Sequence, residues 1–168
     1  MPSEVLLYTA PVGDILDLAE PPALGAPVEE PTMKAALLQE NGSVSIAEHP
    51  RPAAQGQAVI RVRAAGVCGT ELHFQDGILK PEAYPFILGH EISGVVEELT
   101  GEELGFHIGD RVTVYNLLAC GACKQCRLGR DELCDAASGQ LGFNRDGGFA
   151  EFVRAPLSAR ALARPGLV

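Results

Sequence analysis

Residues 120–134 read CGACKQCRLGRDELC and place four of the chain's five cysteines at the spacing C-x2-C-x2-C-x7-C. Two cysteines separated by two residues can direct their thiolates to one point, and four thiolates complete the closed tetrahedral shell of a structural zinc ion. We therefore expect one tightly held zinc in a lobe spanning residues 117–136. Its predicted ligands are Cys120, Cys123, Cys126 and Cys134.

Disulfides and an iron–sulfur cluster are the alternatives for these cysteines. Disulfides are disfavoured in a reducing compartment. An iron–sulfur run of this type is typically C-x2-C-x2-C-x3-C-P, whereas here seven residues precede the last cysteine and Asp135 follows it. Zinc is therefore the preferred interpretation, and basic side chains in the loop would offset the charge of a zinc tetrathiolate. These side chains are Lys124, Arg127 and Arg130.

The chain around this lobe reads as short strands separated by glycine-rich turns. An apolar run, the turn signal Asn41-Gly42 and an alternating run predict a hairpin. Residues Ile60, Val62 and Ala64 alternate with two arginines, which predicts one buried strand face. We expect helical turns only at Cys68–Phe74 and in the cysteine loop, so the fold class is mainly β, a closed or nearly closed barrel. The expected strands are Met33–Gln39, Ser43–Glu48, Gln57–Ala65, Gly89–Leu99, Asp110–Asn116 and Gly148–Ala155.

Charge and proline content set residues 1–32 apart from the remainder. The chain carries a formal charge of −9, and residues 1–32 contain acidic groups but no lysine or arginine. Closely spaced prolines there oppose regular structure, so we expect a flexible extension before a single domain over residues 33–168. A negative charge argues against a nucleic-acid partner. The sequence shows no membrane-spanning run and no basic leader typical of a signal peptide, so we expect a cytoplasmic protein.

A second group of metal-binding residue types lies in two separate segments. Cys68 follows an apolar strand, and His90 with Glu91 interrupts another apolar run. Cysteine, histidine and glutamate are all competent zinc ligands. A lone cysteine or histidine is more often an ordinary core or surface residue, but burial of a His-Glu pair requires a compensating partner, and a cation would serve.

These segments resemble the zinc-dependent medium-chain alcohol and polyol dehydrogenases. The resemblance covers residues 33–168 with the motifs in the family's order, and it implies the GroES-like β-barrel that carries the catalytic site. The matching motifs are Cys68-Gly69-Thr70-Glu71-Leu72-His73, Gly89-His90-Glu91-x2-Gly94, the four-cysteine loop, Gly109-Asp110-Arg111-Val112 and Gly147-Gly148-Phe149-Ala150-Glu151-Phe152.

The resemblance also implies roles for individual residues. Cys68 and His90 would bind a second, weaker catalytic zinc, with Glu91 as a further or exchanging ligand. Thr70 would accept a hydrogen bond from the substrate hydroxyl and pass its proton on, and His73 would continue that relay toward solvent. Relatives usually have aspartate where Glu71 stands. This carboxylate would orient His90, as metal-bound histidines commonly require.

The implied reaction is oxidation of a small alcohol, with hydride transfer to NAD(P). No two of the 19 glycines are separated by a single residue, so the G-x-G-x-x-G signature of a nucleotide-binding Rossmann domain does not occur. We therefore expect this oxidoreductase part to be inactive alone, and to associate with a nucleotide-binding domain or form a homo-oligomer. A stand-alone zinc-binding barrel acting as a binding module is the alternative. A polar residue at Asn116, a position that lines the substrate pocket in relatives, favours a polyol or another polar alcohol.

Overall fold

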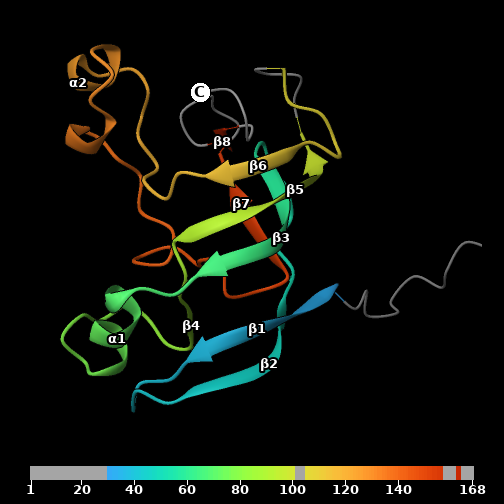
Figure 1. Cartoon of the computed structure of the whole chain (residues 1–168), viewed down its shortest axis with the longest axis vertical. Coiled ribbons are helices and arrows are strands. Elements are labelled where there is room, and N and C mark those ends of the chain that lie inside the picture. Colours follow the sequence, from blue (N-terminus) through green and yellow to red (C-terminus); the bar gives the residue numbers. More distant parts are fainter. Residues whose placement is uncertain (1–29, 101–104, 157–161, 164–168) are drawn as a thin grey trace, which may run out of the picture.

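The described part of the chain folds into two antiparallel sheets, as the mainly β class predicted. The computed structural model describes residues 30–100, 105–156 and 162–163. A three-stranded sheet has the order β2-β1-β4, and a five-stranded sheet beside it has the order β7-β3-β5-β6-β8 (Figure 1). The strands are β1 Thr32–Leu38, β2 Val44–Pro50, β3 Ala58–Gly66, β4 Phe86–Ile87, β5 Glu91–Leu99, β6 Arg111–Val114, β7 Phe152–Ala155 and β8 Leu162–Ala163.

The predicted hairpin is formed by β1 and β2. Gly42 adopts a φ of 80° in the connecting turn, and the Asn41 side chain accepts a hydrogen bond from the Ser43 N–H at 3.0 Å. The positive φ explains why this turn uses glycine. Alternate residues of β1 are buried, whereas most of β2 is exposed. Residues 1–29 of the predicted extension lie outside the described residues. At its other end, β1 begins at Thr32, one residue before the predicted start of the domain.

Residues 149–151 join the two sheets. The Ala36 N–H donates to the Phe149 carbonyl at 2.8 Å, and the Val62 N–H donates to the Glu151 carbonyl at 2.9 Å. One short segment therefore pairs with β1 of the small sheet and with β3 of the large sheet, which gives the two sheets a barrel-like continuity. The largest apolar core lies against the five-stranded sheet. Its fully buried members include Ile60, Val96, Val112 and Leu162.

The ladder between β3 and β5 contains two irregularities that change which side chains are buried. The register shifts by one residue between Val59 and Ile60 and again between Val62 and Ala64. Ile60 is fully buried and Val62 is half-buried, but Ala64 is exposed. The prediction that Ala64 shares their buried face was therefore wrong, because the bulge after Val62 interrupts the alternation.

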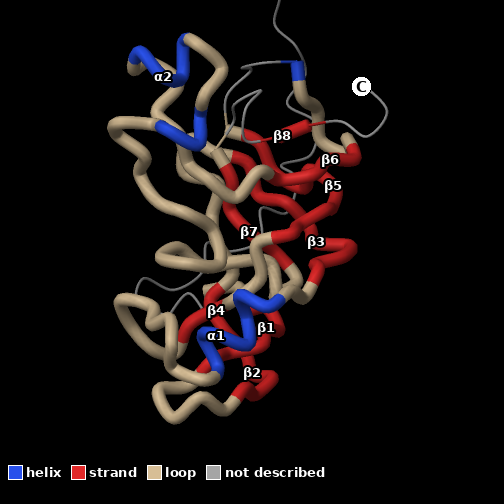
Figure 2. The backbone as a smooth tube through the Cα atoms, turned by 60° about the vertical axis from the view of Figure 1, so that its left-hand side comes forward, coloured by secondary structure: helices blue, strands red, loops and turns tan. Residues whose placement is uncertain are grey.

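Both α-helices lie on the same side of the sheets, where β3 and β6 end (Figures 1 and 2). Helix α1 spans Gly69–Gln75, which confirms the expected helical turn after Cys68, and α2 spans Lys124–Arg127 in the cysteine loop, followed by a 3-10 turn, η2, at Asp131–Leu133. The two-residue strands β4 and β8 were not predicted. None of the described helices has the length and apolar character needed to cross a membrane.

Candidate metal centres

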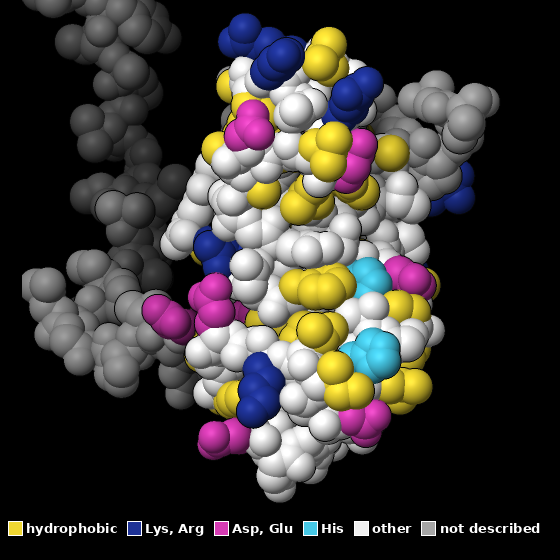
Figure 3. All heavy atoms as spheres, turned by 90° about the vertical axis from the view of Figure 1, so that its left-hand side faces the viewer, with side chains coloured by type: hydrophobic (Ala, Val, Ile, Leu, Met, Phe, Trp, Pro, Cys, Tyr) yellow, Lys and Arg dark blue, Asp and Glu magenta, His cyan; other side chains and the backbone are white. Residues whose placement is uncertain are grey.

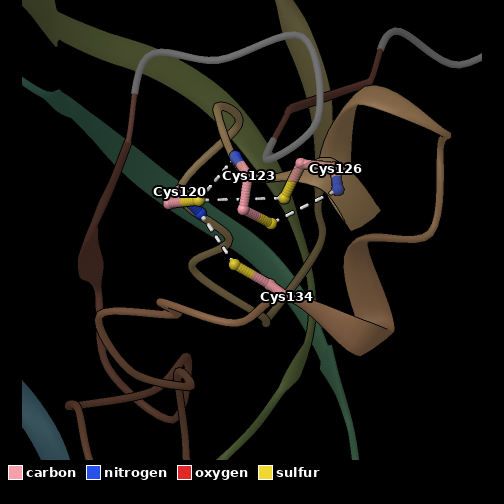
Figure 4. A group of neighbouring side chains, drawn as sticks. All are labelled: Cys120, Cys123, Cys126 and Cys134. Carbon is pink, nitrogen blue, oxygen red and sulfur yellow. Dashed lines mark hydrogen bonds between the residues drawn. The ribbon is translucent and has the colours of Figure 1, made fainter.

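The four cysteines of the lobe converge as a group. Their sulfur atoms all lie within 4.8 Å of one another, and all four are free thiols (Figure 4). The Cys120 and Cys126 sulfurs are 4.0 Å apart. Two sulfurs bound to one tetrahedral zinc at Zn–S distances near 2.3 Å would be separated by roughly 3.8 Å. The group therefore fits a zinc tetrathiolate.

Backbone amides of the lobe point at the sulfur atoms. The Cys123 N–H donates to the Cys120 sulfur at 3.4 Å, and the Cys120 N–H donates to the Cys134 sulfur at 3.3 Å. The Cys126 N–H donates to the Cys123 sulfur at 3.5 Å, and the same sulfur caps the N-terminus of α2. Donors aimed at sulfur favour the thiolate over the thiol, which is the form that binds metal.

The pKa values within this group diverge. Hydrogen bonds from the backbone at Ala122 and Cys123 lower the pKa of Cys120 to about 6, and backbone donors at Cys126 and Asp135 lower the pKa of Cys123. Burial, with the neighbouring sulfurs adding to it, raises the pKa of Cys126 to about 12. Four thiolates this close repel one another, so a divalent cation is the partner that lets all four ionise together.

The second group consists of Cys68, Glu71 and His90, whose ligand atoms also lie within 4.8 Å of one another. The Cys68 sulfur is 3.5 Å from Nε2 of His90. A thiolate and an imidazole on one tetrahedral zinc would be about 3.5 Å apart, given bonds near 2.3 and 2.0 Å. This pair therefore fits the first two ligands of a metal, and it leaves coordination positions open.

Helix α1 begins at this group, and its N-terminal cap forms part of it. Cys68 is the N-cap residue, and its sulfur accepts the Thr70 N–H at 3.3 Å. The carboxylate of Glu71 accepts the Cys68 N–H at 2.9 Å through one oxygen, and its other oxygen lies 3.0 Å from Nδ1 of His90. This arrangement is a capping box whose second carboxylate oxygen faces an imidazole, although that oxygen and Nδ1 do not form a hydrogen bond of good geometry. With Nδ1 facing a carboxylate, Nε2 is the nitrogen left to bind metal.

The other predicted site residues lie around this group. Thr70 and His73 are three residues apart on α1, and His73 is exposed. Glu91 is the first residue of β5; it is exposed, pairs with Gly66 across the ladder, and its carboxylate lies against the Gly66 backbone. Glu71, rather than Glu91, is thus the carboxylate grouped with Cys68 and His90.

Sequence reasoning missed Phe143. Its ring centroid lies 5.1 Å from that of His90, and its ring also contacts Phe74 edge-on at 5.8 Å. Phe143 belongs to no metal-binding or catalytic motif, and it follows His90 by 53 positions, so no signal in the sequence alone pointed to it.

The face that carries both groups is chemically divided. Basic side chains gather over the α2 lobe at the top of the view in Figure 3, whereas hydrophobic side chains surround histidine side chains in its lower half. Several large apolar residues are exposed in the segment around α1, the helix that begins at the second group. They are Val67, Leu72, Ile78 and Leu79.

Comparison with known proteins identifies relatives that contain this domain. The model of the alcohol dehydrogenase GroES-like domain family matches residues 54–164. The L-threonine 3-dehydrogenase of Shewanella sp. (strain W3-18-1) is 35% identical over 123 residues, which are 71% of this chain and 36% of that enzyme. The L-threonine 3-dehydrogenase of Deinococcus deserti is 39% identical over 112 residues, which are 65% of this chain and 32% of that enzyme. The chain therefore spans about a third of the length of these relatives.

Solved structures give the same result. A thermostable alcohol dehydrogenase from Pyrobaculum aerophilum with bound cobalt and zinc superposes with a TM-score of 0.73 and 33% identity, covering 82% of this chain and 43% of that one. Galactitol-1-phosphate dehydrogenase from Escherichia coli superposes with a TM-score of 0.67 and 30% identity, covering 79% of this chain and 38% of that one. The chain therefore belongs to the alcohol dehydrogenase GroES-like domain family.

Proposed function

We propose that this chain binds a catalytic metal and an alcohol substrate for oxidation by NAD(P), as part of a dehydrogenase. The observation that carries the proposal is the group of Cys68, Glu71 and His90, in which one imidazole nitrogen faces a thiol and the other faces a carboxylate. Such a carboxylate–histidine pair fixes the tautomer and orientation of a metal-binding imidazole. A bound zinc ion would supply Lewis acidity that lowers the pKa of an alcohol hydroxyl.

The chain's own residues would prepare and deprotonate the substrate. Cys68 and His90 would hold the metal, and Glu71 would keep Nε2 of His90 directed toward Cys68. Thr70, at the second position of α1, would accept the hydrogen bond from the substrate hydroxyl. His73 lies one helical turn further on and is exposed, so it would deliver the proton to solvent. Glu91 would act only as an exchanging ligand, because its carboxylate must first leave the Gly66 backbone.

The four-cysteine lobe would hold a structural zinc. Its four sulfurs form a closed group, so no coordination position remains for a substrate. We further propose a reducing, cytoplasmic location, since the five cysteines are free and the lobe depends on thiolates.

The nicotinamide would be held by a nucleotide-binding domain associated with this chain. The exposed apolar side chains of Val67, Leu72 and Ile78, in the segment around α1, would offer that domain a surface to cover. The isolated chain would therefore show negligible alcohol oxidation with either NAD or NADP.

The substrate would be a small polar alcohol. The matched relatives include L-threonine 3-dehydrogenases and a galactitol-1-phosphate dehydrogenase, whose names denote hydroxyl substrates carrying further polar groups. The half-buried Asn116, just before the cysteine loop, would provide a polar contact.

The test uses the full chain with cobalt in place of zinc. Cobalt bound at Cys68 should give a thiolate charge-transfer band and visible d–d bands that shift on addition of L-threonine or a polyol, and shift less with 1-butanol. In the Cys68→Ser variant the shift should disappear while the cobalt spectrum of the four-cysteine lobe persists. Alcohol-induced shifts that survive in Cys68→Ser, or a wild-type chain that binds only one cobalt, would contradict the proposal.

A further inference from the structure

The segment from Ser138 to Phe149, here termed the clasp, packs its backbone directly against the residues that lead into His90. The Gly147 N–H donates to the Ile87 carbonyl at 2.8 Å, and the Gly148 N–H donates to the Gly89 carbonyl at 2.8 Å. The Phe149 N–H donates to the Leu88 carbonyl at 3.0 Å. Three consecutive carbonyls before His90 are therefore bound by the clasp.

Glycines make this close approach possible. A Cβ added at Gly147 would lie 2.5 Å from the Leu88 carbonyl oxygen. A Cβ added at Gly142 would lie 2.7 Å from the Gly89 carbonyl oxygen and 3.1 Å from the His90 nitrogen. Real side chains do not tolerate contacts this short with backbone, so any larger residue would push the clasp away from His90.

The tip of the clasp is held by its own polar contacts. The Arg145 guanidinium donates to the Ser138 carbonyl at 2.9 Å and to the Asn144 carbonyl at 2.7 Å. The Asn144 side chain accepts the Gln140 N–H at 2.7 Å, and the Gly142 N–H donates to the Arg145 carbonyl at 2.7 Å. These bonds close the loop on both sides of Phe143 and fix the direction in which its side chain leaves.

Phe143 contacts the imidazole through its ring, whereas Glu71 contacts it through Nδ1. Its ring is tilted by 53° to that of His90 at a centroid distance of 5.1 Å, and Phe74 supports it edge-on with an interplanar angle of 72°. Glu71 lies 3.0 Å from one nitrogen of His90, but these two buried atoms do not form a hydrogen bond of good geometry, so this contact alone leaves the ring free to rotate. An aromatic ring packed at this distance limits such rotation and covers part of the imidazole surface.

We propose that Phe143 is a positioning residue for His90, and that the clasp exists to hold it there. Glu71 selects the imidazole nitrogen that is left to bind metal, and Phe143 sets the plane of the ring so that this nitrogen faces Cys68. This inference rests on the proposed function of Cys68 and His90 as metal ligands, and it adds an aromatic partner from a segment that follows the cysteine lobe.

The decisive experiment compares Phe143→Leu with Phe152→Leu in the full chain. Phe152 is also half-buried, but it packs against the core cluster that contains Met33, with Arg51 over its ring. Both variants remove one aromatic ring, so both should lose comparable thermal stability. Phe143→Tyr, which keeps the ring, should behave like the wild type.

Two readouts separate positioning from ordinary packing. Nitrogen-15 NMR of metal-free Phe143→Leu should show the His90 ring nitrogens averaging between tautomers, whereas wild type and Phe152→Leu should keep the proton on Nδ1. Cobalt affinity at the Cys68 group should fall about 10-fold in Phe143→Leu, the lower end of the range for lost outer partners of metal ligands. The four-cysteine lobe should keep its affinity in all variants.

The outcomes are distinct. If Phe143→Leu loses stability but leaves the His90 resonances and cobalt affinity within twofold of Phe152→Leu, Phe143 is a packing residue and the inference fails. If no variant, including wild type, binds cobalt at Cys68 while the His90 resonances still respond to Phe143→Leu, the proposed function fails and the positioning role stands.

Discussion

The cysteine lobe and the Cys68 group are both built to hold a metal, but different parts of the chain establish them. The lobe takes its four sulfurs from 15 consecutive residues, and its local contacts are hydrogen bonds from its own backbone amides to sulfur. The Cys68 group takes Cys68 and Glu71 from the start of α1 and His90 from the position just before β5, and the clasp is bonded to the residues that precede His90. A local site of this kind depends on its metal for order, whereas a site assembled from distant elements depends on the fold.

Replacing Cys123 with serine should have the largest effect on this comparison. Structural zinc is held in peptide sites with roughly 10–16 kcal/mol, and loss of one of four thiolates removes a large share of that stabilisation. We expect the lobe over residues 117–136 to lose hydrogen-exchange protection and the bound zinc to fall by one per chain. Measured zinc content and exchange rates check this. A Cys123→Ser chain that keeps both zinc ions and full protection would show that the lobe is ordered without its metal.

Replacing Gly147 with alanine should have the second-largest effect, and this effect should fall on the clasp and the Cys68 group. The added methyl would collide with the Leu88 carbonyl, so we expect a loss of about 1–3 kcal/mol in the free energy of unfolding, as for overpacked cores. Urea denaturation measures this loss. Gly69→Ala is the matched control, because Gly69 has open space around its Cβ position and lies within α1. Equal free energies of unfolding for the two alanine variants would mean that the clasp accommodates the added methyl group without loss of stability.

Replacing Cys68 with serine should change metal binding far more than folding. Serine is a good helix N-cap, so α1 should persist and the free energy of unfolding should change by less than about 1 kcal/mol. The zinc content should fall by one weakly held ion, measured after dialysis, with the lobe unaffected. A collapse of the whole domain in this variant would contradict the division between a metal-dependent lobe and a fold-dependent group.

The smallest expected difference concerns the reactivity of the metal-free lobe toward iodoacetamide. Because backbone donors lower the pKa of Cys120 to about 6, its thiolate form should predominate at pH 7, and its alkylation should slow as pH falls through about 6. Burial raises the pKa of Cys126 to about 12, so this thiol should stay protonated and unreactive throughout that range. Mass spectrometry of alkylated peptides measures both rates, and added zinc should suppress them. Faster alkylation of Cys126 than of Cys120 would contradict the assignment.

The sequence alone predicted the cysteine lobe more completely than the Cys68 group, because the lobe is local in the chain and the Cys68 group is not. Ligand spacing in the lobe encodes its geometry directly, since turns between cysteines two residues apart leave few ways to arrange the sulfurs. Cys68 and His90 meet only because β3 pairs with β5, and pairing partners are not readable from spacing. The resemblance to a known family supplied that contact. The role of Glu71 toward His90 was expected from the resemblance, and the distance of 3.0 Å between them supports it.

Three features escaped sequence reasoning because they depend on tertiary contacts. Strands β4 and β8 contain two residues each, too few for an alternating pattern to appear. The exposure of Ala64 follows from a bulge that no residue type signals. Phe143 contacts His90 because glycine residues let two backbones meet, and neither partner lies near the other in the chain.

The two bulges in the β3–β5 ladder have a consequence for how this domain tolerates changes in length. The second shift reverses the first, so Ala58 opposite Leu99 and Gly66 opposite Glu91 follow the same frame, although the three pairs made by residues 60–62 do not. Deletion of one residue at either irregularity would leave its counterpart uncompensated. Every residue beyond it would then be displaced by one position, including the stretch that delivers Cys68 opposite His90. Insertions and deletions in these strands should therefore survive only as matched pairs, one in each strand.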